Sequence, residues 1–367
     1  MMAQCEVAEP QRTVLVFQGG GALGAYQAGV YEALHEHGVE PDWIIGTSIG
    51  AINGAIIASN RREDRLDKLR EFWRRIELRP VPQVPLWGPL AGFLGNWSAI
   101  THGIPGFFRP NPAAWLGGVH APLGVGQAGY YLTDALRSTL ADVTGFMPDK
   151  ACGVRLSLGA VNVGNGDMHY FDSSREALSV EHVMASGALP PAFPAVRIGD
   201  DYWWDGGIVS NTPIEAIFDD QPLRDSLVFA VNLWQDNGSE PSSIWQAAGR
   251  QKDIQYSSRA DHHIEDERKL QHLRKIIGEL GTQLTDAQRA DPEIKALLAQ
   301  GECLTLHIVR LFAPALDGEN HTKDIDFTAA GIEARWQAGY SDTRTMLDRQ
   351  PWHQPCDRLQ GVHVHTL

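Results

Sequence analysis

A single serine, Ser48, stands between two glycines in the sequence GTSIG at residues 46–50, directly after the apolar run WII. A strand that turns sharply into a helix at this serine would hold the hydroxyl out of a sheet as a nucleophile. Gly46 and Gly50 would then let the strand and the helix pass closely on either side. A glycine-rich turn with a serine that caps the helix is the structural alternative for the same five residues.

A second stretch, QGGGALGAY, follows a β-branched strand. Gly19, Gly21 and Gly24 fit the pattern G-x-G-x-x-G, which is typical of dinucleotide sites. Such a site needs an acidic residue near the end of the next strand, and Asp42 instead precedes that strand, so dinucleotide binding is disfavoured. The backbone N–H groups of Gly19, Gly20 and Gly21, at a helix N-terminus beside the serine, would form an oxyanion hole.

A serine nucleophile needs a proton acceptor. Asp205 is framed by the aromatic residues YWW and by Gly206 and Gly207, but Asp-Gly is also a common turn pair. None of the 14 histidines occupies a small-residue turn that would fix its position. The pair His262-His263 lies in a charged helical stretch and His321 in a loop, so we interpret them as surface residues. These patterns alone leave the identity of the base open.

The elements that position these residues alternate between strand and helix. Strands are predicted at residues 13–17, 43–45, 153–163, 168–172 and 226–234, and a helix over 65–76 follows the helix that starts at the serine. This order predicts an α/β fold whose central, mostly parallel sheet carries helices on both faces. The residues after 239 are predicted to be helical, with one late strand at 303–312 and a helix at 326–348 capped by Asp326. Four apolar residues at helical spacing are predicted to pack into the core: Leu270, Leu273, Ile277 and Leu280.

The segment between Glu77 and Asp134 contains no other acidic residue, and its formal charges are Arg79 and Arg109. It is rich in Pro, Gly, Trp and Phe, which is too apolar for a solvated linker and too irregular for one long helix. The segment is therefore either a cover on the core or an apolar lid at the mouth of a site.

Composition excludes several classes of function. A net charge of -14 argues against nucleic acid and against polybasic docking on anionic lipid. The four cysteines lie far apart, so neither a metal knuckle nor a disulfide framework is expected. We expect no signal peptide, no transmembrane segment, no metal, no cofactor and a cytoplasmic location.

Taken together, QGGGALGAY, GTSIGAING and DGGIVSNTPI, with ASGALPPAFPAV before the third, resemble the patatin-like phospholipase family over about residues 12–218. The resemblance implies an α/β/α catalytic domain at 12–235, with an insertion at about 78–133. It also implies a helical extension at 239–367 that packs on this domain, as in some bacterial members. Ser48 matches the family's nucleophile and Asp205 its base in a Ser–Asp dyad, and the three glycines from residue 19 match its oxyanion loop.

The implied activity is that of a serine lipid acyl hydrolase, phospholipase A-like, which cleaves carboxylic esters through an acyl-enzyme and contacts membranes peripherally. Burial by the aromatic neighbours of Asp205 is expected to raise the pKa of this base. The family often has a basic residue where this chain has Leu23, and its loss favours neutral esters over phosphate head groups. Thioester or hydroxyalkanoate polyester hydrolysis with the same dyad, a silent lipid-binding protein and a cofactor-binding oxidoreductase are the alternatives.

Overall fold

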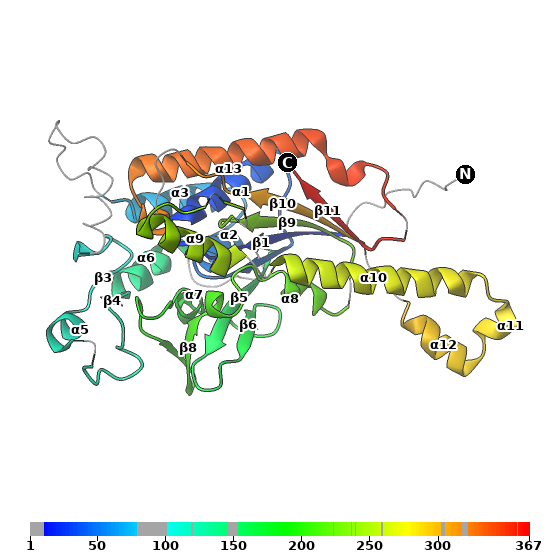
Figure 1. Cartoon of the computed structure of the whole chain (residues 1–367), viewed down its shortest axis with the longest axis horizontal. Helices are drawn as coiled ribbons and strands as arrows, with labels where there is room; N and C mark the ends of the chain where they lie inside the picture. Colours follow the sequence, from blue (N-terminus) through cyan, green and yellow to red (C-terminus); the bar gives the residue numbers. More distant parts are fainter. Residues whose placement is uncertain are drawn as a thin grey trace.

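The computed structural model describes residues 11–78, 101–118, 120–144, 153–222, 224–235, 237–238, 240–257, 260–301, 305–316, 322–357 and 359–367. Within these residues the chain is built on one nine-stranded sheet (Figure 1). Its strands are β1 (Arg12–Phe17), β2 (Trp43–Gly46), β5 (Arg155–Asn162), β6 (Met168–Asp172), β7 (Val196–Ile198), β8 (Asp201–Asp205), β9 (Ser226–Asn232), β10 (Leu306–Phe312) and β11 (Val362–Thr366). A separate two-stranded sheet pairs β3 (Arg109–Pro110) with β4 (Tyr131–Leu132).

The large sheet has the strand order β11-β10-β9-β1-β2-β5-β8-β7, and β6 also pairs with β5. All pairs from β11 to β5 are parallel, whereas β6, β7 and β8 run antiparallel to their neighbours. The central parallel strands β1, β2 and β9 are buried almost throughout, as expected for strands that are covered on both faces. The mostly parallel sheet that the sequence predicts is therefore confirmed.

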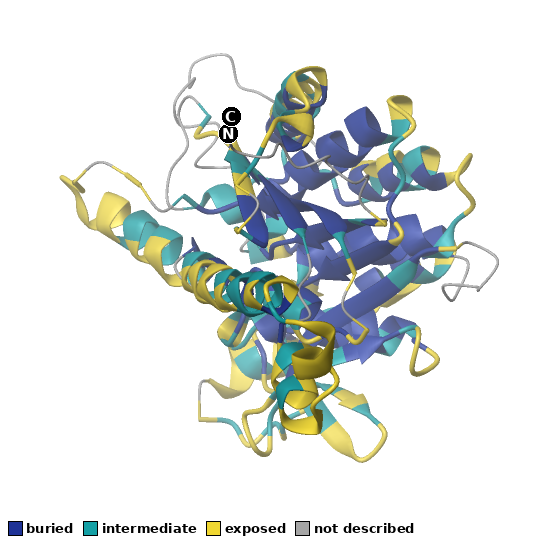
Figure 2. Ribbon diagram, turned by 90° about the vertical axis from the view of Figure 1, so that its right-hand side faces the viewer, coloured by how far each residue is buried: buried dark blue, intermediate teal, exposed yellow. Residues whose placement is uncertain are grey.

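Helices cover both faces of this sheet, as predicted (Figure 2). Odd-numbered residues of β1, such as Leu15 and Phe17, belong to the larger core, whereas Val14 and Val16 belong to the smaller one. The smaller core is covered by α8 (Glu215–Phe218) and by the start of α10 (Ala260–Thr282). The larger core is covered by α1 (Ala25–Glu36), α2 (Ile49–Ser59), α3 (Arg65–Arg75), α6 (Asp134–Thr144), α7 (Val180–Ser186) and α13 (Ala329–Arg349).

The residues after 239 are not helices alone, because β10 and β11 continue the sheet beyond β9. Helix α13 packs along α1, and the two backbones approach so closely that a Cβ at Gly29 or Gly339 would overlap the partner helix. The division of the chain at residues 235–239 stays a prediction, and the sheet crosses it. The remaining helices are α5 (Pro112–Gly117), α9 (Ile244–Ser257), α11 (Asp286–Arg289) and α12 (Pro292–Ala299).

Two local predictions in this region are wrong. Helix α10 extends away from the sheet with α11 and α12 (Figure 1), so Leu270, Leu273 and Leu280 are 42%, 58% and 62% exposed instead of buried. Helix α13 is capped by Thr328, whose side chain accepts the Gly331 N–H, and not by Asp326. The Asp326 carboxylate accepts the Thr328 hydroxyl at 2.8 Å, so it supports the cap from outside the helix.

Candidate active site

The turn between β2 and α2 has the geometry that its glycines predict. Ser48 adopts φ 57° and ψ -122°, a backbone conformation that a residue with a side chain rarely occupies. A Cβ at Gly46 would overlap the backbone of Gly50, and a Cβ at Gly50 would overlap the carbonyl of Phe17. Strand, helix and the neighbouring strand β1 therefore pass in backbone contact, and the serine stands at the N-terminus of α2.

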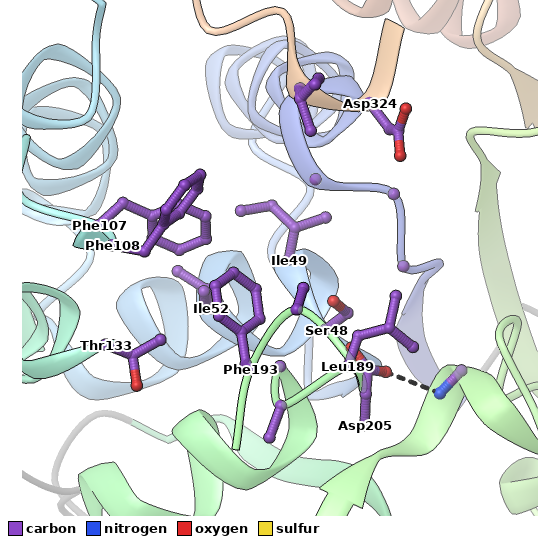
Figure 3. A pocket seen from close by; sticks show the side chains of 18 of the residues that line it. Ser48, Ile49, Ile52, Phe107, Phe108, Thr133, Leu189, Phe193, Asp205 and Asp324 are labelled. Atoms are coloured by element: carbon purple, nitrogen blue, oxygen red, sulfur yellow. Dashed lines mark hydrogen bonds between the residues drawn. The ribbon is translucent and has the colours of Figure 1, made fainter. Parts of the chain in front are cut away.

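The register of the sheet places Asp205 at the same end of the sheet as this serine. Gly46 of β2 pairs with Leu158 of β5, and Ala160, two residues farther along β5, pairs with Asp205 of the antiparallel strand β8. Ser48 lies two residues beyond Gly46, so the serine and the aspartate meet at the same end of the sheet. Figure 3 shows the two side chains adjacent, on elements separated by more than 150 residues of chain.

Asp205 is 1% exposed. Burial raises its pKa from 3.8 to about 7, while the hydrogen bond from the Gly207 N–H and the neighbouring Ser48 side chain oppose the rise. The Gly207 N–H donates to Oδ1 at 2.8 Å. Gly206 lies against β5, where a Cβ would come within 2.6 Å of the Gly159 carbonyl oxygen. The aspartate is thus held in place by its own glycines and is poised to take up a proton near neutral pH.

The glycine loop after β1 is fixed at its first residue. The Gly19 N–H donates to the Asn211 carbonyl at 3.1 Å, and the Gly19 carbonyl accepts from Asn211 Nδ2 at 3.0 Å and Trp234 Nε1 at 2.7 Å. The Gly19 N–H is therefore already engaged. Among the described residues, the N–H groups of Gly20 and Gly21 have no protein acceptor, so these two remain the candidate oxyanion donors.

Sequence reasoning missed Gln18, which directly precedes this loop and is completely buried. Its Nε2 donates to Thr212 Oγ1 at 2.6 Å and to the Tyr256 carbonyl at 3.0 Å. Its Oε1 accepts the N–H groups of Leu233 and Trp234. The signal in the sequence was a polar residue between an apolar strand and a glycine triplet. A side-chain amide buried at that position needs hydrogen-bond partners for both its oxygen and its nitrogen.

An apolar cavity of about 200 Å³ opens beside the serine and the aspartate. Phe107 and Phe108, from the segment without acidic residues, form part of its wall, so this part of the segment faces the site (Figure 3). Trp97 of the same segment lies outside the described residues. The described lining residues include no Lys, Arg or His. Further apolar members of the lining are Ile49, Ile52, Leu136, Met184, Ala188, Leu189, Ala192, Phe193, Trp234, Ile325 and Phe327.

Two of the histidines considered from the sequence, His262 and His263, do not line this cavity. His263 Nδ1 lies 3.3 Å from a carboxylate oxygen of Glu215, and His262 lies on the same helix, α10. His321 lies outside the described residues. Leu23 is 3% exposed and packs in the larger core, so it brings no charge to the cavity.

The described residues contain neither a candidate metal cluster nor a candidate membrane span. No group of three or more His, Cys, Asp or Glu side chains in this part of the chain is arranged to hold a metal ion. None of its helices combines the length and the apolar character that crossing a bilayer requires.

A family model described as patatin-like phospholipase matches residues 15–218, which is more than half of the chain and contains Ser48 and Asp205. The chain belongs to the patatin-like phospholipase family. A second model, described as patatin phospholipase, matches residues 254–359. The resemblance seen in the three sequence stretches is thereby confirmed.

Relatives of this patatin-like protein match it over a small part of their own length. Triacylglycerol lipase ptl3 of Schizosaccharomyces pombe is 40% identical over 60 residues, which is 16% of this chain and 12% of that protein. Lysophospholipase nte1 of Aspergillus niger is 23% identical over 245 residues, 64% of this chain and 13% of that protein. The matched part is thus a small fraction of each relative's length.

Among solved structures, VipD from Legionella pneumophila superposes with a TM-score of 0.38 at 15% identity, covering 93% of this chain and 67% of that one. ExoU of Pseudomonas aeruginosa, in its heterodimeric complex with SpcU, gives a TM-score of 0.28 at 19% identity, covering 80% and 58%.

Proposed function

We propose that this patatin-like protein is a serine lipid acyl hydrolase in which Ser48 and Asp205 form a catalytic dyad. The observation that carries the proposal is the Asp205 carboxyl group, which is fully buried, has a pKa raised to about 7 and lies beside the side chain of a serine in a strained turn (Figure 3). A general base works best when its pKa lies near the working pH, and an ordinary aspartate falls about three pH units short.

In the proposed reaction, Ser48 Oγ attacks the carbonyl carbon of an ester while its proton passes to the Asp205 carboxylate. The oxyanion is stabilised by the N–H groups of Gly20 and Gly21, each such donor being worth about 10²–10³ in rate. Protonated Asp205 then gives its proton to the leaving alcohol oxygen, and an acyl ester remains on Ser48. Water, deprotonated by Asp205, attacks this ester, and the serine recovers its proton as the fatty acid leaves.

The cavity supports an apolar acyl chain as the group that enters the site. Its charged lining residues are Asp205 and Asp324, and the Asp324 carboxylate is paired with Lys252 at 2.8 Å. The described lining offers no cation to a phosphate head group, and Leu23 is buried elsewhere. Neutral esters of long-chain acids are therefore the preferred substrates in this proposal.

The test combines covalent labelling with turnover. A fluorophosphonate should add to the wild-type protein at Ser48, read by intact mass and peptide mapping, and Ser48→Ala should remain unlabelled. Ser48→Ala and Asp205→Asn should each lose at least about 10³-fold in hydrolysis of p-nitrophenyl butyrate, and the double variant should be scarcely worse, because the pair acts as a unit. Full turnover by Asp205→Asn would reject the dyad.

A further inference from the structure

The segment between residues 110 and 133 has an outward face that the catalytic proposal does not use. It contains no Asp, Glu, Lys or Arg, in a chain whose net charge is -14. Trp115 and Leu116, on α5, are 56% and 91% exposed, and Tyr130 is 40% exposed. We call the exposed residues of this segment the uncharged surface. Figure 1 places α5 at one end of the molecule and α12 at the other.

The loop that carries the uncharged surface is ordered, because the buried side chain of Asn111 forms hydrogen bonds across it. Asn111 is 3% exposed, and its Oδ1 caps α5 by accepting the Ala113 N–H at 3.1 Å. Its Nδ2 donates across the loop to the carbonyls of Gln127 at 3.0 Å and Gly129 at 2.9 Å. The β3–β4 pair closes the ends of the loop. The exposed Trp115 is thus presented by an anchored loop.

The inner side of the same segment belongs to the cavity wall. Tyr131 and Thr133 line the cavity, and the Tyr131 ring lies 4.8 Å from Phe108, centroid to centroid. Phe108 in turn lies 5.4 Å from Phe193, another lining residue. The segment therefore has one face toward solvent and one toward the proposed acyl site.

The exposed leucines of α10 and α12 provide a contrast within the same chain. Leu270 directly follows Arg268 and Lys269, both exposed and each 3.4 to 3.8 Å from an acidic partner on the same helix. Moving such charges into a lipid interface is costly, whereas the uncharged surface has no formal charge to desolvate. Exposed Trp and Leu side chains on a short helix are suited to the boundary between head groups and acyl chains.

We propose that the uncharged surface docks on an electrically neutral lipid membrane of phosphatidylcholine type, with Trp115 and Leu116 entering the interface. The strongly negative net charge opposes anionic lipid, so a zwitterionic membrane is the matching partner. The idea that an ester passes from that membrane into the cavity beside Phe108 rests on the proposed function. The docking of the protein on the membrane does not depend on it.

The experiment uses the full chain carrying Ser48→Ala, so that no lipid is consumed, in co-flotation with phosphatidylcholine vesicles. Adding Trp115→Ser and Leu116→Ser should lower the partition coefficient about 30-fold. Adding Leu297→Ser, at a leucine that is 66% exposed on α12, should leave it unchanged. Vesicles with added phosphatidylglycerol should bind the background protein more weakly.

Equal flotation of the paired variant and its background would overturn the proposal, as would binding only to anionic vesicles. A dimer that light scattering detects and the paired substitutions dissociate would assign the surface to a second copy instead. The catalytic proposal is judged separately, in the Ser48 background, by hydrolysis of soluble p-nitrophenyl acetate. The paired variant should retain that activity, and a wild-type protein that floats without hydrolysing any ester would reject the catalytic proposal alone.

Discussion

The side-chain amides of Gln27 and Asn53 are hydrogen-bonded to each other in the core, with Asn53 Nδ2 donating to Gln27 Oε1 at 2.9 Å. Both side chains are completely buried. Gln27 Nε2 also donates to the Gln18 carbonyl at 2.7 Å, and Asn53 Nδ2 to the Gly24 carbonyl at 2.9 Å. The pair therefore ties helix α2, which starts after Ser48, to both ends of the glycine loop.

Replacing Asn53 by Asp should lower kcat at least about 10-fold with little change in KM, because the variant loses both donors and the glycine loop moves relative to the nucleophile. Stability should also fall by about 2–4 kcal/mol, since buried acceptors lose their partners. Steady-state kinetics on p-nitrophenyl butyrate and the rate of fluorophosphonate labelling measure the first effect, and denaturant unfolding the second.

Asn60 provides a matched control at the other end of α2. Its Nδ2 donates to the carbonyls of Ile56 at 2.8 Å and Val143 at 2.9 Å, so Asn60→Asp removes two similar donors away from the site. This variant should lose stability and keep its kcat. Equal losses of kcat in the two variants would show that Asn53 acts only through the stability of the fold.

The pH dependence of kcat/KM should report the titration of Asp205. The base is active when deprotonated, and its pKa is about 7, so kcat/KM should be low at pH 5, rise through pH 7 and level off above pH 8. The measurement uses a soluble short-chain ester, so that lipid binding does not enter. A rise centred near pH 4 would mean that the carboxyl group is not desolvated in solution.

Stability should depend on the same carboxyl group with the opposite trend. The folded-state pKa of about 7 exceeds the ordinary 3.8, so the folded protein holds an extra proton between these values. The contribution is fully present below pH 3.8 and is lost as the pH rises through 7. The shift in the pKa of Asp205 means that burial disfavours the charged carboxylate by about 4 kcal/mol.

Asp205→Asn removes this cost and retains an oxygen for the Gly207 N–H. The Tm of this variant should therefore exceed that of the wild type by a larger margin at pH 8 than at pH 5, by differential scanning calorimetry at both values. A variant that melts below the wild type by the same margin at both pH values would contradict the buried charge.

How far the sequence predicts the site depends on how local each signal is. The turn at Ser48 can be predicted from five neighbouring residues, because only glycine allows the backbone contacts on either side of the serine. The structure has that turn. The use of the Gly19 N–H by Asn211 joins residues nearly 200 positions apart, so no local pattern could have revealed it. The prediction that the leucines of α10 are buried is wrong for the same reason. Helical spacing shows that they share a face, but it does not show which element that face will contact.

The wall formed by Phe107 and Phe108 should set the preference for acyl chain length. The side chains are 9% and 7% exposed, and each gives about 1.5–3 kcal/mol when fully buried against apolar partners. Replacing both by Ala should raise KM at least about 10-fold for p-nitrophenyl dodecanoate. It should barely change KM for the acetate, whose chain is too short to reach them.

Phe72 is the control, because it is fully buried in the same core but does not line the cavity. Phe72→Ala should lower Tm and affect both esters in the same proportion. A proportional loss on both esters in the Phe107 and Phe108 variant as well would make the segment a cover for the core and not a wall of the acyl site.

Strand β9 lies between β1 and β10, and the stretches matched by the two family models fall on either side of it in the sequence. A chain that stopped near residue 235 would make β9 an edge strand, because the side that pairs with β10 would lose its partner, and such an edge is a template for intermolecular strand pairing. It would also uncover the side of α1 that Gly29 and Gly339 keep in backbone contact with α13. We therefore expect the two matched stretches to unfold together, and we expect a fragment that folds by itself to need the C-terminal strands β10 and β11.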